Sequence, residues 1–66
     1  MNKIGEGQGF VAYEKDGKVI LEIDPATPGV RSQSGKSMVI ASSRGNIALP
    51  VGGKVYNLGL NFYTKA

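Results

Sequence analysis

The fold class is decided by the stretch FVAYEKDGKVILEI, residues 10–23. In it, two runs of alternating apolar and polar side chains flank the dipeptide Asp16-Gly17. Asp-Gly is typical of a two-residue type I′ turn, because both central positions of that turn need a positive φ angle. The stretch therefore predicts a β-hairpin in which Phe10 lies opposite Ile23.

Alternation along this hairpin divides its side chains between two faces. The face that we expect to look into the core carries Phe10, Ala12, Val19, Leu21 and Ile23. The opposite face carries Val11, Tyr13 and Ile20 among charged residues. It is more apolar than a solvated face requires, so we interpret it as a contact surface for another molecule.

Further along the chain, alternating segments occupy residues 36–43, 46–51 and 54–64. Arg44-Gly45 and Gly52-Gly53 separate them, and we interpret both as two-residue turns of a three-stranded meander. Ile40 would then lie opposite Leu49, Leu49 opposite Tyr56, Ser42 opposite Ile47 and Ile47 opposite Leu58. In this register one face carries nine large apolar side chains, which are Met38, Ile40, Ile47, Leu49, Val51, Tyr56, Leu58, Leu60 and Phe62. A slip of one residue would turn the whole set toward solvent, so the register is strongly specified.

The remaining segments carry few strand signals. Residues 24–35 contain two prolines and a Ser/Gly-rich end, which predicts a long loop, and residues 1–9 are rich in glycine. No segment has helical periodicity over three turns. We therefore predict an all-β fold, a small five-stranded barrel or sandwich made of a β-hairpin, a long loop and a three-stranded meander, with no substantial helix. Residues 1–9 form a flexible N-terminal arm in this prediction, and residues 10–66 form a single all-β domain.

Composition excludes several classes of function. The chain of 66 residues has neither cysteine nor histidine, which excludes disulfides, Cys-based or His-based metal sites and Ser-His hydrolases. Gly35-Lys36-Ser37 matches the end of a P-loop, but no glycine stands at the required spacing before it and a strand pattern follows. We expect no catalysis, no cofactor, no metal and no small-molecule substrate. No apolar run suits a secretory signal or a membrane span, so a cytoplasmic location is predicted.

Charge is unevenly distributed along the sequence. All five acidic residues lie within residues 1–24, where three lysines leave a balance of 3 − 5 = −2. Residues 25–66 contain no acid and five cations, which are Arg31, Lys36, Arg44, Lys54 and Lys65. This asymmetry predicts an electropositive side that attracts polyanions, provided that the two halves of the chain do not interleave. The alternative is a spread of single solubilising charges, since no two of these cations are adjacent.

Small β modules bind single-stranded nucleic acid by combining cations for phosphates with aromatic side chains on which bases stack. The candidate base platforms are Tyr13 and Tyr63, and the candidate phosphate contacts are Arg31, Lys36, Arg44 and Lys54. Single-stranded DNA or RNA is therefore the expected partner. Homo-oligomerisation is expected as well, because a core this small has no disulfide or metal to support it. The alternative function is a structural or protein-interaction module that self-associates.

One stripe admits two interpretations. The outer face of the last predicted strand carries Val55, Asn57, Gly59, Asn61 and Tyr63. A glycine inside a strand marks either a close approach by another backbone or ligand, or a point at which a long strand coils.

Overall fold

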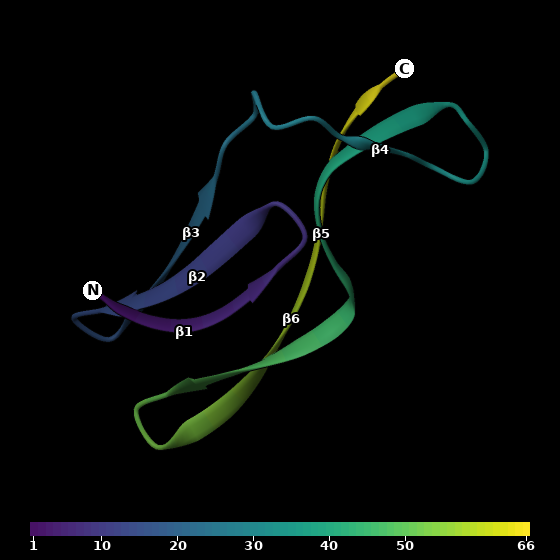
Figure 1. Cartoon of the computed structure of the whole chain (residues 1–66). Coiled ribbons are helices and arrows are strands. Elements are labelled where there is room, and N and C mark those ends of the chain that lie inside the picture. The colour runs from purple at the N-terminus through teal and green to yellow at the C-terminus, as the bar shows by residue number, and fades with distance from the viewer.

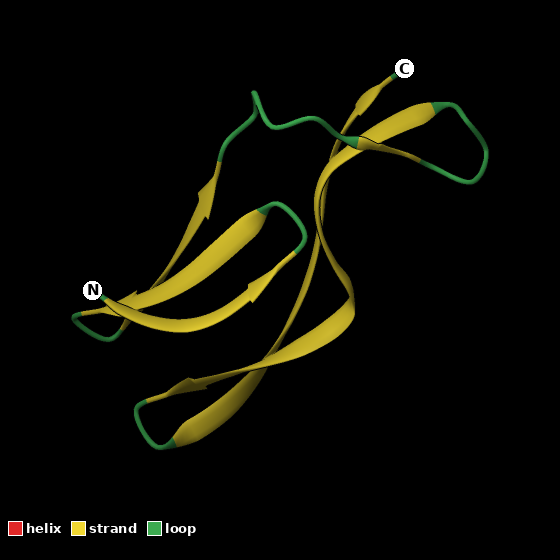
Figure 2. Cartoon of the chain, in the orientation of Figure 1, coloured by secondary structure: helices red, strands yellow, loops and turns green.

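The computed structural model describes residues 1–66, and the prediction of an all-β chain without a helix is confirmed (Figures 1 and 2). Accordingly, there is no helix long and apolar enough to cross a membrane. The strands are β1 (Asn2–Gly7), β2 (Phe10–Lys15), β3 (Lys18–Ile23), β4 (Val30–Arg31), β5 (Ser37–Val51) and β6 (Lys54–Lys65). They form two three-stranded antiparallel sheets, here called the N-terminal sheet, with strand order β1-β2-β3, and the C-terminal sheet, with strand order β4-β5-β6. Together the sheets do not close into a barrel.

The hairpin of β2 and β3 has the predicted turn and register. Asp16 and Gly17 have φ angles of 53° and 77°, as a type I′ turn requires. Phe10 lies opposite Ile23, and the pairing runs without a shift to Lys15 opposite Lys18. The turn and the apolar alternation thus act together to set which side chains face β5.

The hairpin of β5 and β6 also has the predicted turn, at Gly52-Gly53, with φ angles of 58° and 83°. Leu49 lies opposite Tyr56 and Ile47 opposite Leu58, as the apolar pattern predicted.

The predicted turn at Arg44-Gly45 is wrong. Both residues do have positive φ angles, 53° and 95°, but the chain continues as one strand of 15 residues, β5. Ser43 explains the difference, because its hydroxyl oxygen accepts the backbone N–H of Leu60 at 2.8 Å and carries the ladder across the extra residues. Arg44-Gly45 is therefore a bulge, Ile40 lies in the same strand as Leu49 rather than opposite it, and Ser42 likewise does not pair with Ile47.

Two segments without strand signals nevertheless pair. Residues 2–7, expected to form part of an N-terminal arm, form β1, which pairs along β2. Its glycines allow a close approach to β5, since a Cβ added at Gly5 would lie 2.5 Å from Leu49 Cδ2. At Gly9, after β1, an added Cβ would lie 2.1 Å from the carbonyl oxygen of Ile40. In the long loop, residues 30–31 form β4 and pair with β5.

The core lies between β1 and β2 on one side and β5 on the other. Its buried apolar side chains are Phe10, Ala12, Ala41 and Leu49. Val19, Tyr56 and Phe62, all predicted to be inward-facing, are 44%, 53% and 41% exposed, because the two sheets overlap only in part. The molecule measures 40 × 21 × 12 Å. Its radius of gyration is 12.9 Å, against about 11 Å for a compact chain of this length.

Gln8 supplies all the hydrogen bonds between the two sheets. Its backbone N–H donates to the carbonyl of Ser42 at 3.1 Å, and its carbonyl accepts the N–H of Ser42 at 2.9 Å. Its side-chain amide donates to the carbonyl of Val39 at 3.4 Å and accepts from Nε of Arg44 at 3.3 Å. The hydrogen bonding between the sheets is therefore concentrated at a single residue, beside the apolar core that the sheets share.

Candidate functional site

The two oppositely charged halves of the chain do not interleave. The N-terminal sheet and the residue that follows it hold all five acidic residues, whereas residues 25–66 hold five cations and no acid. The one ion pair joins Lys3 Nζ to Glu6 Oε1 at 2.8 Å within β1. The hydrogen bond to the Glu6 carboxylate, with its negative charge, raises the pKa of Lys3 above the usual 10.5. The cations of the C-terminal sheet thus have no carboxylate partner.

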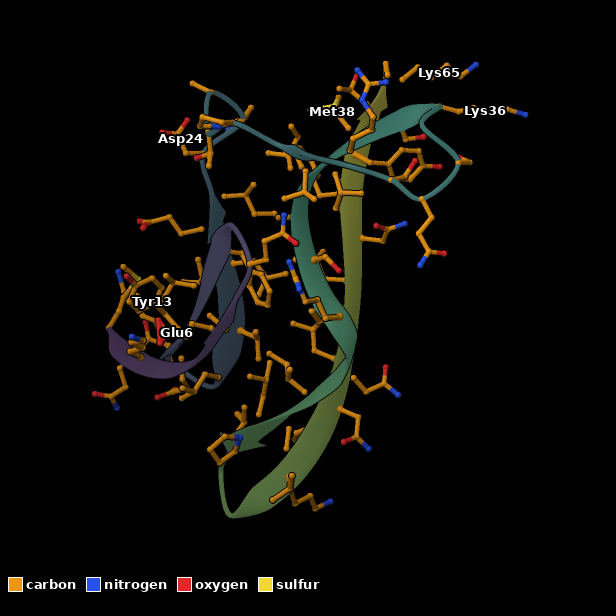
Figure 3. All side chains as sticks on the ribbon, turned by 45° about the vertical axis from the view of Figure 1, so that its right-hand side comes forward. Glu6, Tyr13, Asp24, Lys36, Met38 and Lys65 are labelled. Carbon is orange, nitrogen blue, oxygen red and sulfur yellow. The ribbon has the colours of Figure 1, made fainter.

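Three of these cations gather at one end of the C-terminal sheet, the end away from the Gly52-Gly53 turn. Lys65 lies opposite Ser37, Arg31 lies opposite Met38, and the backbone of Lys36 accepts the N–H of Ala66 at 3.0 Å. Figure 3 shows Lys36, Met38 and Lys65 together at this end. We call Arg31, Lys36 and Lys65 the basic end. Lys65 was not among the predicted site residues.

Tyr63 lies next to the basic end. It pairs with Val39 and is 56% exposed. Since side chains alternate along a strand, Tyr63 shares a face of the sheet with Lys65. Arg31 belongs to the opposite face, and its guanidinium Nη1 donates to the carbonyl of Gly35 at 3.0 Å. This end of the sheet therefore offers one exposed aromatic ring with a cation beside it and further cations around it.

The other predicted site residues lie elsewhere. Lys54 follows the Gly52-Gly53 turn, eleven residues from Lys65 along β6, which corresponds to roughly 36 Å in an extended strand. Tyr13 is half-buried on β2 of the N-terminal sheet, where it pairs with Lys3 and Ile20. Figure 3 shows it well away from Lys36 and Lys65. The six predicted residues do not form a single patch.

Arg44 occupies the bulge in the middle of β5. With a φ angle of 53° it is one of two non-glycine residues with positive φ, and the other, Asp16, lies in a turn. This conformation costs a residue with a Cβ roughly 1–2 kcal/mol. Ser42 Oγ accepts the N–H of Arg44 at 2.9 Å, and Gln8 accepts from its guanidinium. The bulge thus holds an exposed cation between the basic end and Lys54.

Exposed aromatic rings also occur on the inner face of β6, where the sequence predicted core. Tyr56 and Phe62 are 53% and 41% exposed there. Neither was predicted as a site residue, and only their incomplete coverage by the N-terminal sheet distinguishes them. The structure contains no pocket and no cluster of three or more acidic, histidine or cysteine side chains suited to a metal ion.

No model of a known protein family matches the chain, and neither a curated protein nor a solved structure matches it. Its function is therefore inferred from the charges, exposure and geometry of its own residues.

Proposed function

We propose that the protein is a non-catalytic module that binds single-stranded nucleic acid through its C-terminal sheet. One observation carries the proposal: residues 25–66 supply five cations, no acid and no ion pair. Cations left without carboxylate partners remain free to neutralise phosphates, and a surface of one sign attracts a polyanion at long range.

The spacing of these cations favours an extended ligand. Lys65 and Lys54 lie toward opposite ends of a molecule 40 Å long, and Arg44 lies between them. A compact anion would contact one of them, whereas a polymer running along the sheet could contact all. Tyr63, exposed beside Lys65, would stack on a base and contribute about 1–3 kcal/mol. Tyr13 lies in the acidic N-terminal sheet and is not part of this site.

The second candidate is a structural, self-associating module whose cations only keep it soluble. The small core and the exposed apolar side chains favour it. Salt separates the two candidates, since only phosphate neutralisation releases counterions from a nucleic acid.

The test is fluorescence anisotropy of a labelled oligothymidylate between about 50 and 200 mM salt. The logarithm of the binding constant should fall with the logarithm of salt concentration with a slope no steeper than about −3.5 per chain, or about −0.7 for each of the five cations. The variant K36Q/K65Q should make this slope shallower by about 1.4. The matched control K15Q/K18Q, which removes two exposed lysines of the N-terminal sheet, should leave it unchanged. Absence of binding at the lowest salt, or equal effects of both double variants, would exclude the proposal.

A further inference from the structure

Strand β6 is a long edge without the usual protection. It is the last strand in the order β4-β5-β6, and no strand pairs with its outer side. Edge strands are normally blunted by charges, prolines, bulges or shortness. β6 has 12 residues, its register irregularities are taken up by β5, and residues 55–64 contain neither a charge nor a proline. By contrast, the edge strand β3 has six residues and carries Lys18 and Glu22.

The backbone groups that face this open side can be identified. Leu60 donates its N–H to Ser43 on β5, and Ala66 donates to Lys36, so the even-numbered residues point their backbone groups toward β5. Backbone groups alternate in direction along an antiparallel strand. The odd-numbered residues therefore turn their N–H and C=O groups to the open side, and these are Val55, Asn57, Gly59, Asn61 and Tyr63.

The sequence of this edge is nearly palindromic. Residues 55–63 read VYNLGLNFY, with Gly59 at the centre. If two copies of β6 pair antiparallel about a two-fold axis at Gly59, each of residues 56–62 meets a residue of the same kind, and Val55 meets Tyr63. Asn57 then lies opposite Asn61 of the second copy, Leu58 opposite Leu60, and Tyr56 opposite Phe62. Amide, aliphatic and aromatic cross-strand pairs of this kind each contribute roughly 0.2–1 kcal/mol.

The positions of the lysines in β6 are also compatible with an axis at Gly59. With the axis at Gly59, Lys54 meets Thr64 of the second copy, and no two lysines lie opposite each other. If the axis moves by one residue to Leu60, Gly59 meets Asn61 and Val55 meets Lys65. The register centred on Gly59 pairs chemically similar side chains, whereas the register centred on Leu60 does not. Gly59 is therefore the favoured centre.

We propose that β6 pairs with β6 of a second copy of this chain about Gly59, giving one continuous sheet with strand order β4-β5-β6-β6-β5-β4. The pairing would satisfy on the order of ten backbone groups on each edge. It would also support a chain that buries only four apolar residues and has neither a disulfide nor a metal. The pairing joins edges and leaves both faces open, so it does not rest on nucleic-acid binding.

Sedimentation velocity over a range of micromolar concentrations tests the dimer. The wild type should dimerise, and Asn61→Pro should weaken dimerisation at least tenfold, because proline removes an N–H that points to the open side. The ladder to β5 does not use that N–H, so the far-ultraviolet circular dichroism of the variant should match the wild type. Asn61→Ala keeps the N–H and loses only the amide pairs with Asn57, so it serves as the control, and the proline variant should dimerise at least tenfold more weakly than the alanine variant. A monomeric wild type, or a proline variant that dimerises as tightly as the alanine variant, would overturn the proposal.

Cysteine cross-linking tests the register without a proline, and the chain has no cysteine of its own. Cα atoms of directly opposed residues lie about 5.5 Å apart, within reach of a disulfide. A mixture of Asn57→Cys and Asn61→Cys chains should therefore form disulfides between unlike chains. Neither variant alone should cross-link at a comparable rate, because its two cysteines would be offset by four residues, roughly 13 Å. Equal or faster cross-linking within a single variant would overturn the proposed axis.

Discussion

The hydroxyl of Ser43 takes the place of a backbone partner for Leu60. Its oxygen accepts the Leu60 N–H at 2.8 Å, and it also donates to the carbonyl of Gly45. Ser43 is buried, with 7% of its surface exposed. Since a buried N–H without a partner costs about 1–3 kcal/mol, this side chain allows β5 to carry extra residues and still pair with β6 on both sides of them.

Replacing Ser43 by alanine should therefore destabilise the protein by about 1–3 kcal/mol. Urea unfolding at one fixed protein concentration measures this change. Ser34→Ala is the control, because that serine is exposed in the loop between β4 and β5, and its substitution should change stability by less than about 0.5 kcal/mol. Equal effects of the two variants would show that the bulge does not depend on the hydroxyl.

Two glycines with nearly equal φ angles should respond differently to substitution by alanine. Gly9 and Gly17 have φ angles of 75° and 77°. At Gly17 an added Cβ meets nothing within 4 Å, so Gly17→Ala should cost only the conformational strain of about 1–2 kcal/mol. At Gly9 it would overlap the carbonyl oxygen of Ile40, so Gly9→Ala should cost clearly more. Thermal unfolding of both variants gives the comparison, and similar melting temperatures would contradict the close contact at Gly9.

The small core makes each buried side chain important. Leu49 is 3% exposed and packs against Gly5 of β1, so Leu49→Ala should cost about 2–5 kcal/mol. Val19 is 44% exposed, and Val19→Ala should cost clearly less, although the sequence assigned both residues to the core. Chemical denaturation of the two variants measures the difference. A larger loss for Val19→Ala would mean that the hairpin face of β3 is covered in solution.

Arg44 should show opposite effects on stability and binding. Glycine adopts its φ angle of 53° without strain, so Arg44→Gly should stabilise the bulge by up to about 1 kcal/mol, less the bond to Gln8. On the proposed function, the same change removes a phosphate contact and makes the salt slope shallower by about 0.7. Unfolding and oligonucleotide titration of one preparation measure both quantities. A variant that is less stable and binds unchanged would contradict both assignments.

Much of the fold follows from turn chemistry and alternation. Asp16-Gly17 and Gly52-Gly53 form the predicted turns, and the pairings next to them are as predicted. Arg44-Gly45 has the backbone angles of a turn and yet lies within a strand, because a side chain in its environment, Ser43, supplies the missing ladder bond. The dipeptide Arg44-Gly45 carries no information about this hydrogen bond. The sequence alone therefore could not distinguish a two-residue turn from a bulge within one strand.

The irregularities in β5 also explain why the sequence did not predict Lys65 as part of the candidate site. Counting back from the Gly52-Gly53 turn without irregularities would place Lys65 opposite Ile40, whereas it lies opposite Ser37. The register shifts after Val39 and after Ser42 absorb the difference and bring Lys65 to the basic end. The separation of acidic and basic residues, in contrast, was readable from the sequence, because each half of the chain forms its own sheet.

All hydrogen bonds between the two sheets involve Gln8, and this arrangement affects how the molecule opens. Separating the sheets breaks the four hydrogen bonds of Gln8 and uncovers the core side chains between them, but it leaves the ladder within each sheet intact, so opening at this contact is an event distinct from global unfolding. The amide proton of Ser42, which bonds only to Gln8, would then exchange with deuterium through this separation. Its protection factor relative to amides inside β5 reports the docking equilibrium directly.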